Sequence, residues 1–465
     1  MSLKNKLQDK LQELKLVLNG AASIDFPGDP DFYPNTVRWS EYAAPQPGAV
    51  INVAIESDVQ KTVQWAVQNN VKFVAQTGGH GWTTTWNIGE SDIIINLRRM
   101  NNVSVNSKEG YAVIEGGALV QEVIDAAYGE KTHVVVGNCN SVGACGAMLG
   151  GGFSRLQANY SMSIDNIISV RLVTATGEII TVSATENSEL LWCLKGAGHN
   201  FGIVTSAVVN AFPQINGGMH WESTMVFLPD HIEEITQAIN DLDMGEGMSI
   251  HYAFTGLPPF GFPAIVVELW YAGTPAAAQK AFAPIFKLSP IHQESGPIPY
   301  NKINAVLDRG QYKGGFKPTW SVALEKLDPT AARDLWKHFL NFRLRHPSSK
   351  NSVVMFECYA FGKVRQVPEN TASFPWRNLN FHICASLFYT DPAIDNDAIA
   401  WGDKFRQILQ DASGMRQNKV YVNYATGDES LEEIYGYDED RLNRLRAQKA
   451  VWDPEGRFSH YHPIL

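Results

Sequence analysis

Apolar and polar positions in the first 215 residues form short blocks that predict alternating strands and helices. Residues 49–54 and 71–76 are apolar runs of the length typical of buried strands. Between them, valines recur at helical spacing after Ser57-Asp58, which predicts a helix over 57–67. The order strand, helix, strand indicates a βαβ unit near the start of the chain.

The pattern continues and then changes character. It predicts an amphipathic helix over 3–18, strands over 92–97, 111–115, 133–136 and 208–212, helices over 118–128 and 189–194, and a hairpin that pairs 167–174 with 178–182. From about residue 220 to 415, long alternating strands are separated by helices. The clearest strands there are 353–361 and 381–389, and the helices are 228–242, 276–286 and 329–345. This pattern of strands and helices predicts a second domain built on a mostly antiparallel sheet, and an α+β fold for the whole chain.

Composition narrows the possible partners. The 465 residues carry 38 Lys and Arg against 48 Asp and Glu, a net charge of −10, which argues against a nucleic-acid partner. The five cysteines are odd in number and show no C-x-x-C spacing, so neither a disulfide framework nor a metal site is predicted. The N-terminal segment has no apolar signal region, and no apolar run approaches the ~18 residues of a membrane span. We expect a cytoplasmic monomer without a membrane partner.

Two glycine-rich stretches follow predicted strands. The first, 77–87, reads TGGHGWTTTWN and has His80 at its centre, and the second spans 137–154. Glycine permits positive φ and lets backbone N–H groups approach a phosphate closely. Each stretch alone is better explained as a packing turn, with His80 incidental in the first. Together they favour a shared ligand that carries phosphate.

Several common nucleotide and hydrolase motifs are missing. Gly196-Ala-Gly198 with Gly202 misses the G-x-G-x-x-G spacing by one residue and follows a predicted helix, which argues against a dinucleotide fold. The chain contains neither G-x-x-x-x-G-K-[ST] nor G-x-S-x-G. Kinases, P-loop enzymes and hydrolases with a G-x-S-x-G nucleophile are therefore not indicated.

Four motifs together carry a resemblance to a known family. They are TGGHG at 77–81, Gly-x-Cys-x-x-Val-Gly at 137–143 followed by Leu-Gly-Gly-Gly at 149–152, Asn-Phe-Gly-Ile-Val-Thr at 200–205, and Tyr-Val-Asn-Tyr at 421–424 with Asp-Pro at 453–454. In this order and spacing the chain resembles the berberine bridge enzyme-like FAD-linked oxidases, which have the vanillyl-alcohol-oxidase/PCMH-type flavoprotein fold. The resemblance implies an FAD-binding domain over 1–214, with its core at about 45–214, and a substrate-binding domain over 215–415. A C-terminal segment over 416–465 would return to the FAD-binding domain.

The resemblance also implies FAD bonded at two points. His80 matches the histidine joined to the flavin 8α carbon, and Cys139 the cysteine whose sulfur is joined to C6. The chain reads Cys-Asn-Ser-Val-Gly where the family commonly has Cys-Pro-Thr-Val-Gly. The further residues placed at the cofactor are Thr77, Gly78, Gly79, Gly81, Trp82, Ser141, Val142, Gly143, Gly146, Gly151, Gly152, Gly202, Val204 and Asn423.

Tyr424 matches the residue to which the family assigns the role of catalytic base. A phenol of ordinary pKa ~10 needs a neighbour to act near neutral pH, and Lys419, Arg377 and His382 are candidates for that neighbour. Packing of a strand tyrosine on the flavin is an equal alternative, and Tyr421 is a weaker candidate base.

Alternation along two predicted strands gives the substrate-site candidates. Glu357 and Tyr359 share one face of their strand, and His382 and Cys384 share a face of another. The family lines its substrate site from corresponding strands. The alternative is that these polar side chains are simply solvated.

Val142 matches a position where, in the family, a small residue accompanies reaction with O₂. The resemblance therefore implies an oxidase that moves a hydride from a small organic substrate, expected to be a secondary-metabolite intermediate, to FAD, with O₂ as acceptor and H₂O₂ as product. Three alternatives stay open: a cyclase or pericyclase that keeps FAD as a scaffold, a carbohydrate oxidase, and a flavin-carrying binding protein without turnover.

Overall fold

The first of three sheets lies near the N-terminus and is mainly parallel. The computed structural model describes residues 3–257, 259 and 261–464. Four strands lie in the order β1-β2-β4-β3, in which β4 pairs in parallel with both β2 and β3. The predicted βαβ unit is present, with β4 inserted between its strands. Buried positions fill β2 and β4 because a parallel sheet is covered on both faces. The bounds are α1 Leu3–Val17, β1 Ser23–Asp25, α2 Phe32–Thr36, β2 Ala49–Asn52, α3 Glu56–Asn69, β3 Phe73–Gln76 and β4 Ile93–Asn96.

The second sheet is antiparallel and follows directly in the chain. Its order is β5-β6-β10-β8-β9, and β7 also pairs with β10. The predicted hairpin is confirmed as β8 and β9, whose turn places Gly177 at φ +79°. The bounds are β5 Val103–Asn106, β6 Tyr111–Glu115, α4 Val120–Gly129, β7 Thr132–Val134, α5 Ala144–Leu149, α6 Gln157–Tyr160, β8 Ile167–Val173, β9 Ile179–Ser183, α7 Ser188–Ala197 and β10 Ile203–Pro213.

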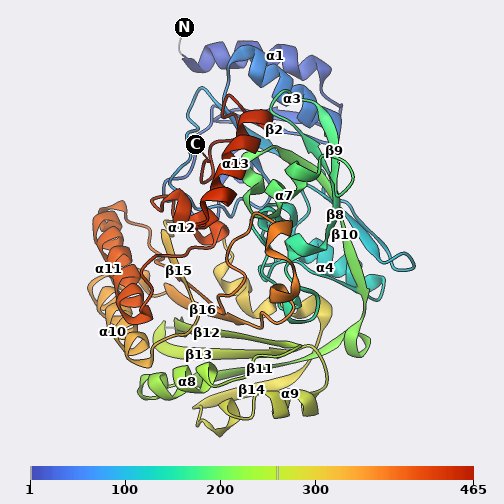
Figure 1. Ribbon diagram of the computed structural model, residues 1–465. Coiled ribbons are helices and arrows are strands. Elements are labelled where there is room, and N and C mark those ends of the chain that lie inside the picture. The colour runs from blue at the N-terminus through green and yellow to red at the C-terminus, as the bar shows by residue number, and fades with distance from the viewer. Residues whose placement is uncertain (1–2, 258, 260, 465) are drawn as a thin grey trace.

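The third sheet has seven strands, all antiparallel, in the order β14-β11-β13-β12-β16-β17-β15. Figure 1 shows it below the N-terminal part, with α8 and α9 near its lower strands β11 and β14 and with α10 and α11 at the left of the view. The predicted antiparallel sheet covered by helices is confirmed. The bounds are β11 Met219–Phe227, α8 Ile232–Asn240, β12 Met248–Leu257, β13 Phe262–Tyr271, α9 Pro275–Ala281, β14 His292–Pro299, β15 Thr319–Leu324, α10 Pro329–Arg345, β16 Val353–Tyr359, β17 Phe381–Ser386 and α11 Asp395–Ser413.

The alternation of side chains divides this third sheet into two unlike faces. Ile250, Tyr252 and Phe254 of β12 pack in one core with apolar residues of α8, α10 and α11. On the other face, Trp270 and Tyr359 pack in a core shared with residues of the second sheet. We call the latter the inner face. It is the surface on which the N-terminal part rests.

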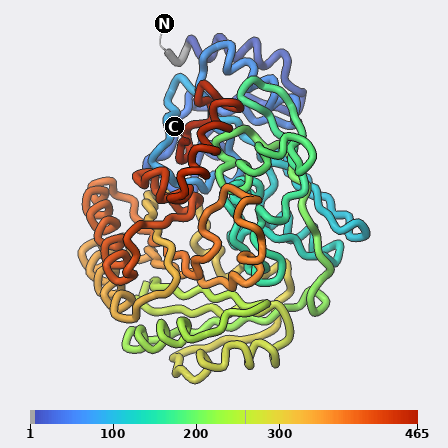
Figure 2. Tube along the Cα trace, in the orientation of Figure 1, coloured from blue at the N-terminus to red at the C-terminus, as the bar shows by residue number. Residues whose placement is uncertain are grey.

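The C-terminal segment runs back to the N-terminal part, as the red end of the trace in Figure 2 shows. Helix α12 covers Leu431–Tyr435 and α13 covers Glu439–Trp452. Arg444 of α13 pairs with Glu189 of α7 at 2.9 Å and lies 4.0 Å from the ring centre of Trp192. The division into domains at residues 214 and 415 stays a prediction.

Several predicted elements need correction. The helix predicted over 276–286 ends at Ala281, and the strand predicted over 381–389 ends at Ser386. The helix predicted over 228–242 is shorter, because a 3-10 turn at Pro229–His231 precedes α8. Tyr424 lies in the 3-10 turn Val422–Tyr424, so the expectation of a strand tyrosine is wrong. The neighbouring Val420 bonds to the Glu433 carbonyl and the Trp376 indole, which replace strand partners. None of the helices within the described ranges has the length and apolar content needed to cross a membrane.

Candidate active site

The two glycine-rich stretches contact each other through their backbones. A Cβ atom built at Gly78 would lie 2.4 Å from the Ser141 carbonyl oxygen, and one at Gly143 would lie 2.7 Å from Cβ of Thr77. Contacts this short leave room only for glycine. The segment that carries His80 and the segment that carries Cys139 therefore form one site.

His80 is held at this junction as a neutral imidazole. Its Nε2 lies 2.7 Å from Oγ of Ser141, and its ring stacks on Trp39 with the ring centres 6.0 Å apart. Burial, followed by the positive charges of Lys313 and Arg38, lowers the pKa of His80 to about 3. An uncharged ring keeps a nitrogen lone pair available for bonding at neutral pH.

Cys139 lies where its loop meets the inner face of the third sheet. Burial, reinforced by the Glu357 carboxylate, raises the pKa of the Cys139 thiol to about 12. The preceding residue, Asn138, donates a hydrogen bond of 2.5 Å from Nδ2 to Oη of Tyr359. This bond ties the cysteine segment to β16, two residues from Glu357.

Tyr424 lies above the same face and bonds to Glu357. Its hydroxyl donates to Oε1 of Glu357 at 2.8 Å, and its ring stacks on Trp82 with the ring centres 5.8 Å apart. Its carbonyl accepts a hydrogen bond from Oγ of Ser321 at 2.9 Å. Burial and Glu357 raise the pKa of Tyr424 well above its ordinary value.

Within the described residues, none of the three side chains named as candidates to lower the pKa of Tyr424 bonds to its hydroxyl, so that expectation is wrong. Arg377 pairs with Asp165 at 2.7 Å, and the ammonium of Lys419 lies 5.7 Å from the centre of the Trp376 ring. Burial lowers the pKa of His382 to about 3, so His382 is also neutral. A carboxylate, and not a cation, is the partner of the phenol.

The four substrate-site candidates come together on the inner face. Glu357 and His382 are directly opposite each other on β16 and β17, and Met355 is opposite Cys384. Oη of Tyr359 donates to Oε2 of Glu357 at 2.6 Å, and the ring of His382 lies 4.1 Å from that of Phe153. Glu357, Tyr359 and His382 are buried, so they are not the solvated side chains of a half-exposed sheet.

The further residues predicted to bind the cofactor make contacts with several parts of the described chain. Asn423 donates to the Ala147 carbonyl at 2.8 Å, and Gly152 donates its N–H to Oη of Tyr421 at 2.8 Å. A Cβ atom at Gly146 would meet no atom within 4 Å, so open space adjoins α5 there. Three other predicted residues make hydrogen bonds: Thr77 Oγ1 to the Gly116 carbonyl, the Gly79 carbonyl from Trp39 N–H, and the Gly81 carbonyl from Arg38. Gly151 packs against Tyr421, and Gly202 packs against Leu172. Val142 and Val204 belong to the core shared with the third sheet.

Comparison with known proteins assigns the chain to a family. Residues 47–183 match the family model described as FAD binding domain. The FAD-linked oxidoreductase anuG of Penicillium roqueforti is 32% identical over 468 residues, covering 98% of this chain and 91% of the relative. This chain belongs to the FAD-linked oxidoreductases.

Solved structures with the same fold extend over the whole chain. Berberine bridge enzyme-like 1 of Physcomitrella patens has a TM-score of 0.84 at 19% identity, covering 100% of this chain and 99% of that one. Glucooligosaccharide oxidase of Acremonium strictum has a TM-score of 0.81 at 19% identity, covering 98% of both chains. The fold of this FAD-linked oxidoreductase is thus the berberine bridge enzyme-like, PCMH-type fold predicted from the sequence.

The residues present fit FAD. Besides the open space at Gly146, the indole Nε1 of Trp82 is buried without a hydrogen-bond partner among the described residues. A buried donor of this kind suits a polar ligand atom. The neutral imidazole of His80 has a free lone pair, and the thiol of Cys139 becomes a nucleophile once it loses its proton, so both residue types can form a bond to the flavin ring.

Three residues of the oxidoreductase's polar interior were missed by sequence reasoning: Arg155, His251 and Glu268. All are buried, and they meet beside Tyr359. Glu268 is the single charged residue in the apolar run 264–270, and Arg155 follows the glycine run at 150–152. Those isolated charges were the available signal.

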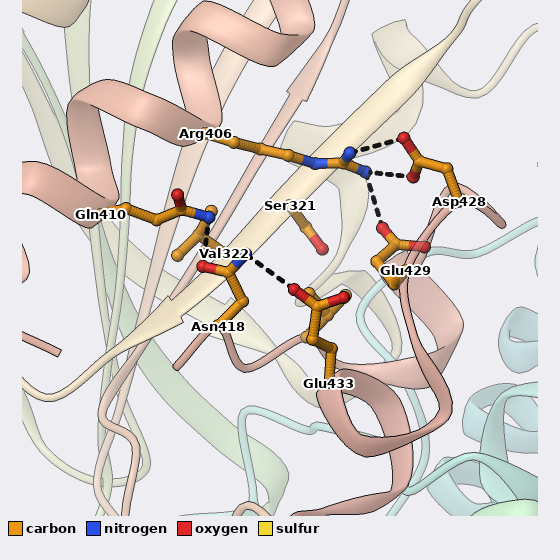
Figure 3. A pocket seen from close by; sticks show the side chains of 9 residues that line it. Ser321, Val322, Arg406, Gln410, Asn418, Asp428, Glu429 and Glu433 are labelled. Atoms are coloured by element: carbon orange, nitrogen blue, oxygen red, sulfur yellow. Dashed lines mark hydrogen bonds and ion pairs between the residues drawn. The ribbon is translucent and has the colours of Figure 1, made fainter. Parts of the chain in front are cut away.

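A cavity lies beside the segment that follows Tyr424, and Figure 3 shows the side chains around it. Arg406 of α11 pairs with Asp428 at 2.8 Å and with Glu429 at 2.7 Å, and Asn418 donates to Glu433 at 2.7 Å. These polar groups bond to one another across the cavity. The cluster therefore fastens the 418–433 segment to the third sheet and its helices.

Proposed function

We propose that this protein is an oxidase that takes a hydride from a small organic substrate, with FAD bonded to His80 and Cys139 and with O₂ as final acceptor, giving H₂O₂. The observation that carries the proposal is the partly buried hydrogen bond of 2.8 Å between Oη of Tyr424 and Oε1 of Glu357. When bound, FAD supplies a two-electron acceptor that takes a hydride.

The pair explains how a proton can leave the substrate. The raised pKa of Tyr424 means that the free phenolate is scarce at neutral pH. Both oxygens of Glu357 accept hydrogen bonds, one from Tyr424 and one from Tyr359, as suits a carboxylate. The substrate O–H or N–H then gives its proton to Oη of Tyr424 while the phenol proton passes to Oε1 of Glu357. The carboxylate is the base, and Tyr424 carries the proton to it.

Two covalent links are proposed for the flavin. The A. strictum glucooligosaccharide oxidase is described as carrying a 6-S-cysteinyl, 8α-N1-histidyl FAD, which supports the assignment of His80 and Cys139. After acid precipitation the protein should stay yellow, and flavin-bearing peptides should include both residues. Cys139→Ala should keep only the histidyl link, and Cys145→Ser, at a buried cysteine outside the contact, should keep both. Release of free FAD from the wild-type protein would remove the proposal.

The substrate is proposed to be a secondary-metabolite intermediate, and its oxidation can be tested spectroscopically. Anaerobic mixing with a true substrate should bleach the flavin absorbance band, and readmitted O₂ should restore the band with formation of H₂O₂. Product formation without bleaching would instead indicate a cyclase, and binding without either change a non-catalytic flavoprotein. Oligosaccharides belong in the same screen, because bleaching by them alone would make the protein a carbohydrate oxidase.

A further inference from the structure

A buried chain of polar groups continues beyond Glu357, away from Tyr424. Oη of Tyr359 donates to Oε2 of Glu357 at 2.6 Å and lies 3.5 Å from Nε2 of His251 on β12. Nδ1 of His251 lies 2.9 Å from Oε2 of Glu268 on β13, and Oε1 of Glu268 lies 2.8 Å from Nη2 of Arg155. Tyr359, His251, Glu268 and Arg155 are each no more than 3% exposed. The function proposed above uses none of the last three.

The partners of His251 decide which nitrogen carries its proton. A carboxylate only accepts hydrogen bonds, so the short contact with Glu268 places a proton on Nδ1. Arg155 is farther from Nδ1, at 3.3 Å, and its closer contact is with Glu268. The lone pair of Nε2 therefore faces the Tyr359 hydroxyl. His251 is a base whose protonated form would rest against a carboxylate.

The hydroxyl of Tyr359 stands between two acceptors and has one proton to give. It donates to Glu357 and accepts from Nδ2 of Asn138 at 2.5 Å. If Glu357 gains a proton from Tyr424 on Oε1, rotation about its Cγ–Cδ bond turns that O–H toward Tyr359 and makes the carboxyl group a donor there. The Tyr359 proton is then free to turn toward Nε2 of His251.

We propose that Tyr359 and His251 form a proton relay that removes the proton from Glu357 and holds it on His251. The relay rests on the proposed function, in which Glu357 receives the substrate proton through Tyr424. The Glu357 O–H bond breaks as its proton passes to Oη of Tyr359, and the Tyr359 O–H bond breaks as its proton passes to Nε2 of His251. Glu357 is again a carboxylate, and His251 is an imidazolium paired with Glu268.

The charges around His251 suit this storage. The buried polar groups from Glu357 to Arg155 include one cation, Arg155, and two carboxylates, Glu268 and Glu357. An added proton on His251 therefore brings the net charge of these groups to zero. Burial alone would raise the pKa of Glu268, but Arg155 and His251 outweigh burial and lower it to about 2. Glu268 is therefore ionised and ready to stabilise the imidazolium.

One neighbouring group competes for the same proton. Glu222 on β11 lies next to β13, and burial together with Glu268 raises the pKa of Glu222 to about 7. The charged and titratable groups that face His251 are thus Glu222, Glu268, Arg155, Glu357 and Tyr359. A test must separate Glu222 from His251.

The proton held on His251 can be used in the second half of the proposed catalytic cycle, in which O₂ is reduced. Reduction of O₂ to H₂O₂ consumes two electrons and two protons. The substrate hydride supplies both electrons and one proton, and the proton held on His251 is the second. No proton then needs to enter the buried site from solvent in each turnover.

The relay predicts a proton count that can be measured without a substrate. In a dithionite titration of the holoenzyme against redox dyes between pH 6 and 8, each proton taken up per two electrons adds about 30 mV per pH unit to the fall in midpoint potential. We expect the wild-type protein to show two protons, about 60 mV per pH unit. His251→Gln should show one. His338→Gln, a matched change on the outer helix α10, should show two.

Tyr359→Phe keeps His251 and Glu268 and removes the linking hydroxyl, together with its bonds to Glu357 and Asn138, so it serves if His251→Gln fails to fold. It should keep the wild-type slope but slow reoxidation of the dithionite-reduced holoenzyme by O₂ roughly 10²-fold. The relay is overturned if the wild-type protein takes up one proton, if His251→Gln still takes up two, if Glu222→Gln alone loses one, or if Tyr359→Phe reoxidises at the wild-type rate. These readouts use no substrate, so failure of the Tyr424–Glu357 proposal would appear separately, in substrate reduction.

Discussion

At the scale of single residues, the proposed function makes Tyr424 and Glu357 act together as a base. The phenol has a raised pKa because it is buried beside a carboxylate, while both carboxylate oxygens are held by hydroxyl groups. A phenol alone would be too weak a base, and Glu357 receives the substrate proton only by way of the Tyr424 hydroxyl. Side chains that act in series in this way are not additive when they are substituted.

Tyr424→Phe should slow anaerobic flavin reduction by a substrate about 10²-fold, because the proton path to Glu357 is cut. Glu357→Gln should slow it by a similar factor, since an amide cannot take the proton. Stopped-flow absorbance of the flavin band measures both rates. The double variant should be no slower than the slower single variant, and multiplied losses would contradict the shared role. Tyr389→Phe, a buried tyrosine bonded to Asp395 on the outer side, is the matched control.

At the scale of elements, the segment that carries Tyr424 is fixed from several directions. The Thr426 carbonyl accepts a hydrogen bond from Thr84 N–H at 2.7 Å, and the Thr426 hydroxyl donates to the Thr319 carbonyl at 2.7 Å. Arg406 of α11 adds its pairs with Asp428 and Glu429 (Figure 3). The segment thereby joins the glycine-histidine stretch, β15 and α11, which keeps the phenol over the inner face.

Arg406→Gln should lower the free energy of unfolding by about 3 kcal/mol, because it leaves the buried Glu429 carboxylate without its cation. Urea unfolding followed by tryptophan fluorescence measures the change. Lys337→Ala breaks an ion pair in which both side chains are at least half exposed, and should cost less than about 1 kcal/mol. Equal losses in the two variants would show that Arg406 does not anchor the segment.

The same scale shows what the sequence could and could not predict. The helix over 329–345 and the hairpin of β8 and β9 were predictable, because spacing and turn chemistry are local. The 3-10 turn at Val422–Tyr424 was not, since its neighbours bond to Glu433 and to the distant Trp376. Alternation placed Glu357 and Tyr359 on one face, but it could not tell that this face is buried against the N-terminal part.

At the scale of the whole molecule, two buried histidines lie where the N-terminal part meets the third sheet. His133 of β7 and His220 of β11 have ring centres 5.0 Å apart, and Tyr300 packs against both. Both ring nitrogens of His220 lack a hydrogen-bond partner within the described chain. Burial, with a smaller effect of His133, lowers the pKa of His220 to about 3, and burial lowers that of His133 to about 4.

This contact makes the assembled molecule sensitive to acid in a definite direction. In the unfolded chain each histidine titrates near pH 6.5. Below that pH the unfolded state therefore binds protons that the native state does not bind. The free energy of unfolding therefore falls as the pH falls from 6.5 toward 4, by about 1.4 kcal/mol per pH unit for each such group. His220→Phe keeps a ring against Trp270 and removes one group, so urea unfolding at pH 6, 5.5 and 5 should show a slope smaller by roughly that amount. His292→Phe, at an exposed position of β14, provides the comparison, and an unchanged slope in His220→Phe would mean that His220 is not the group that makes this junction sensitive to acid.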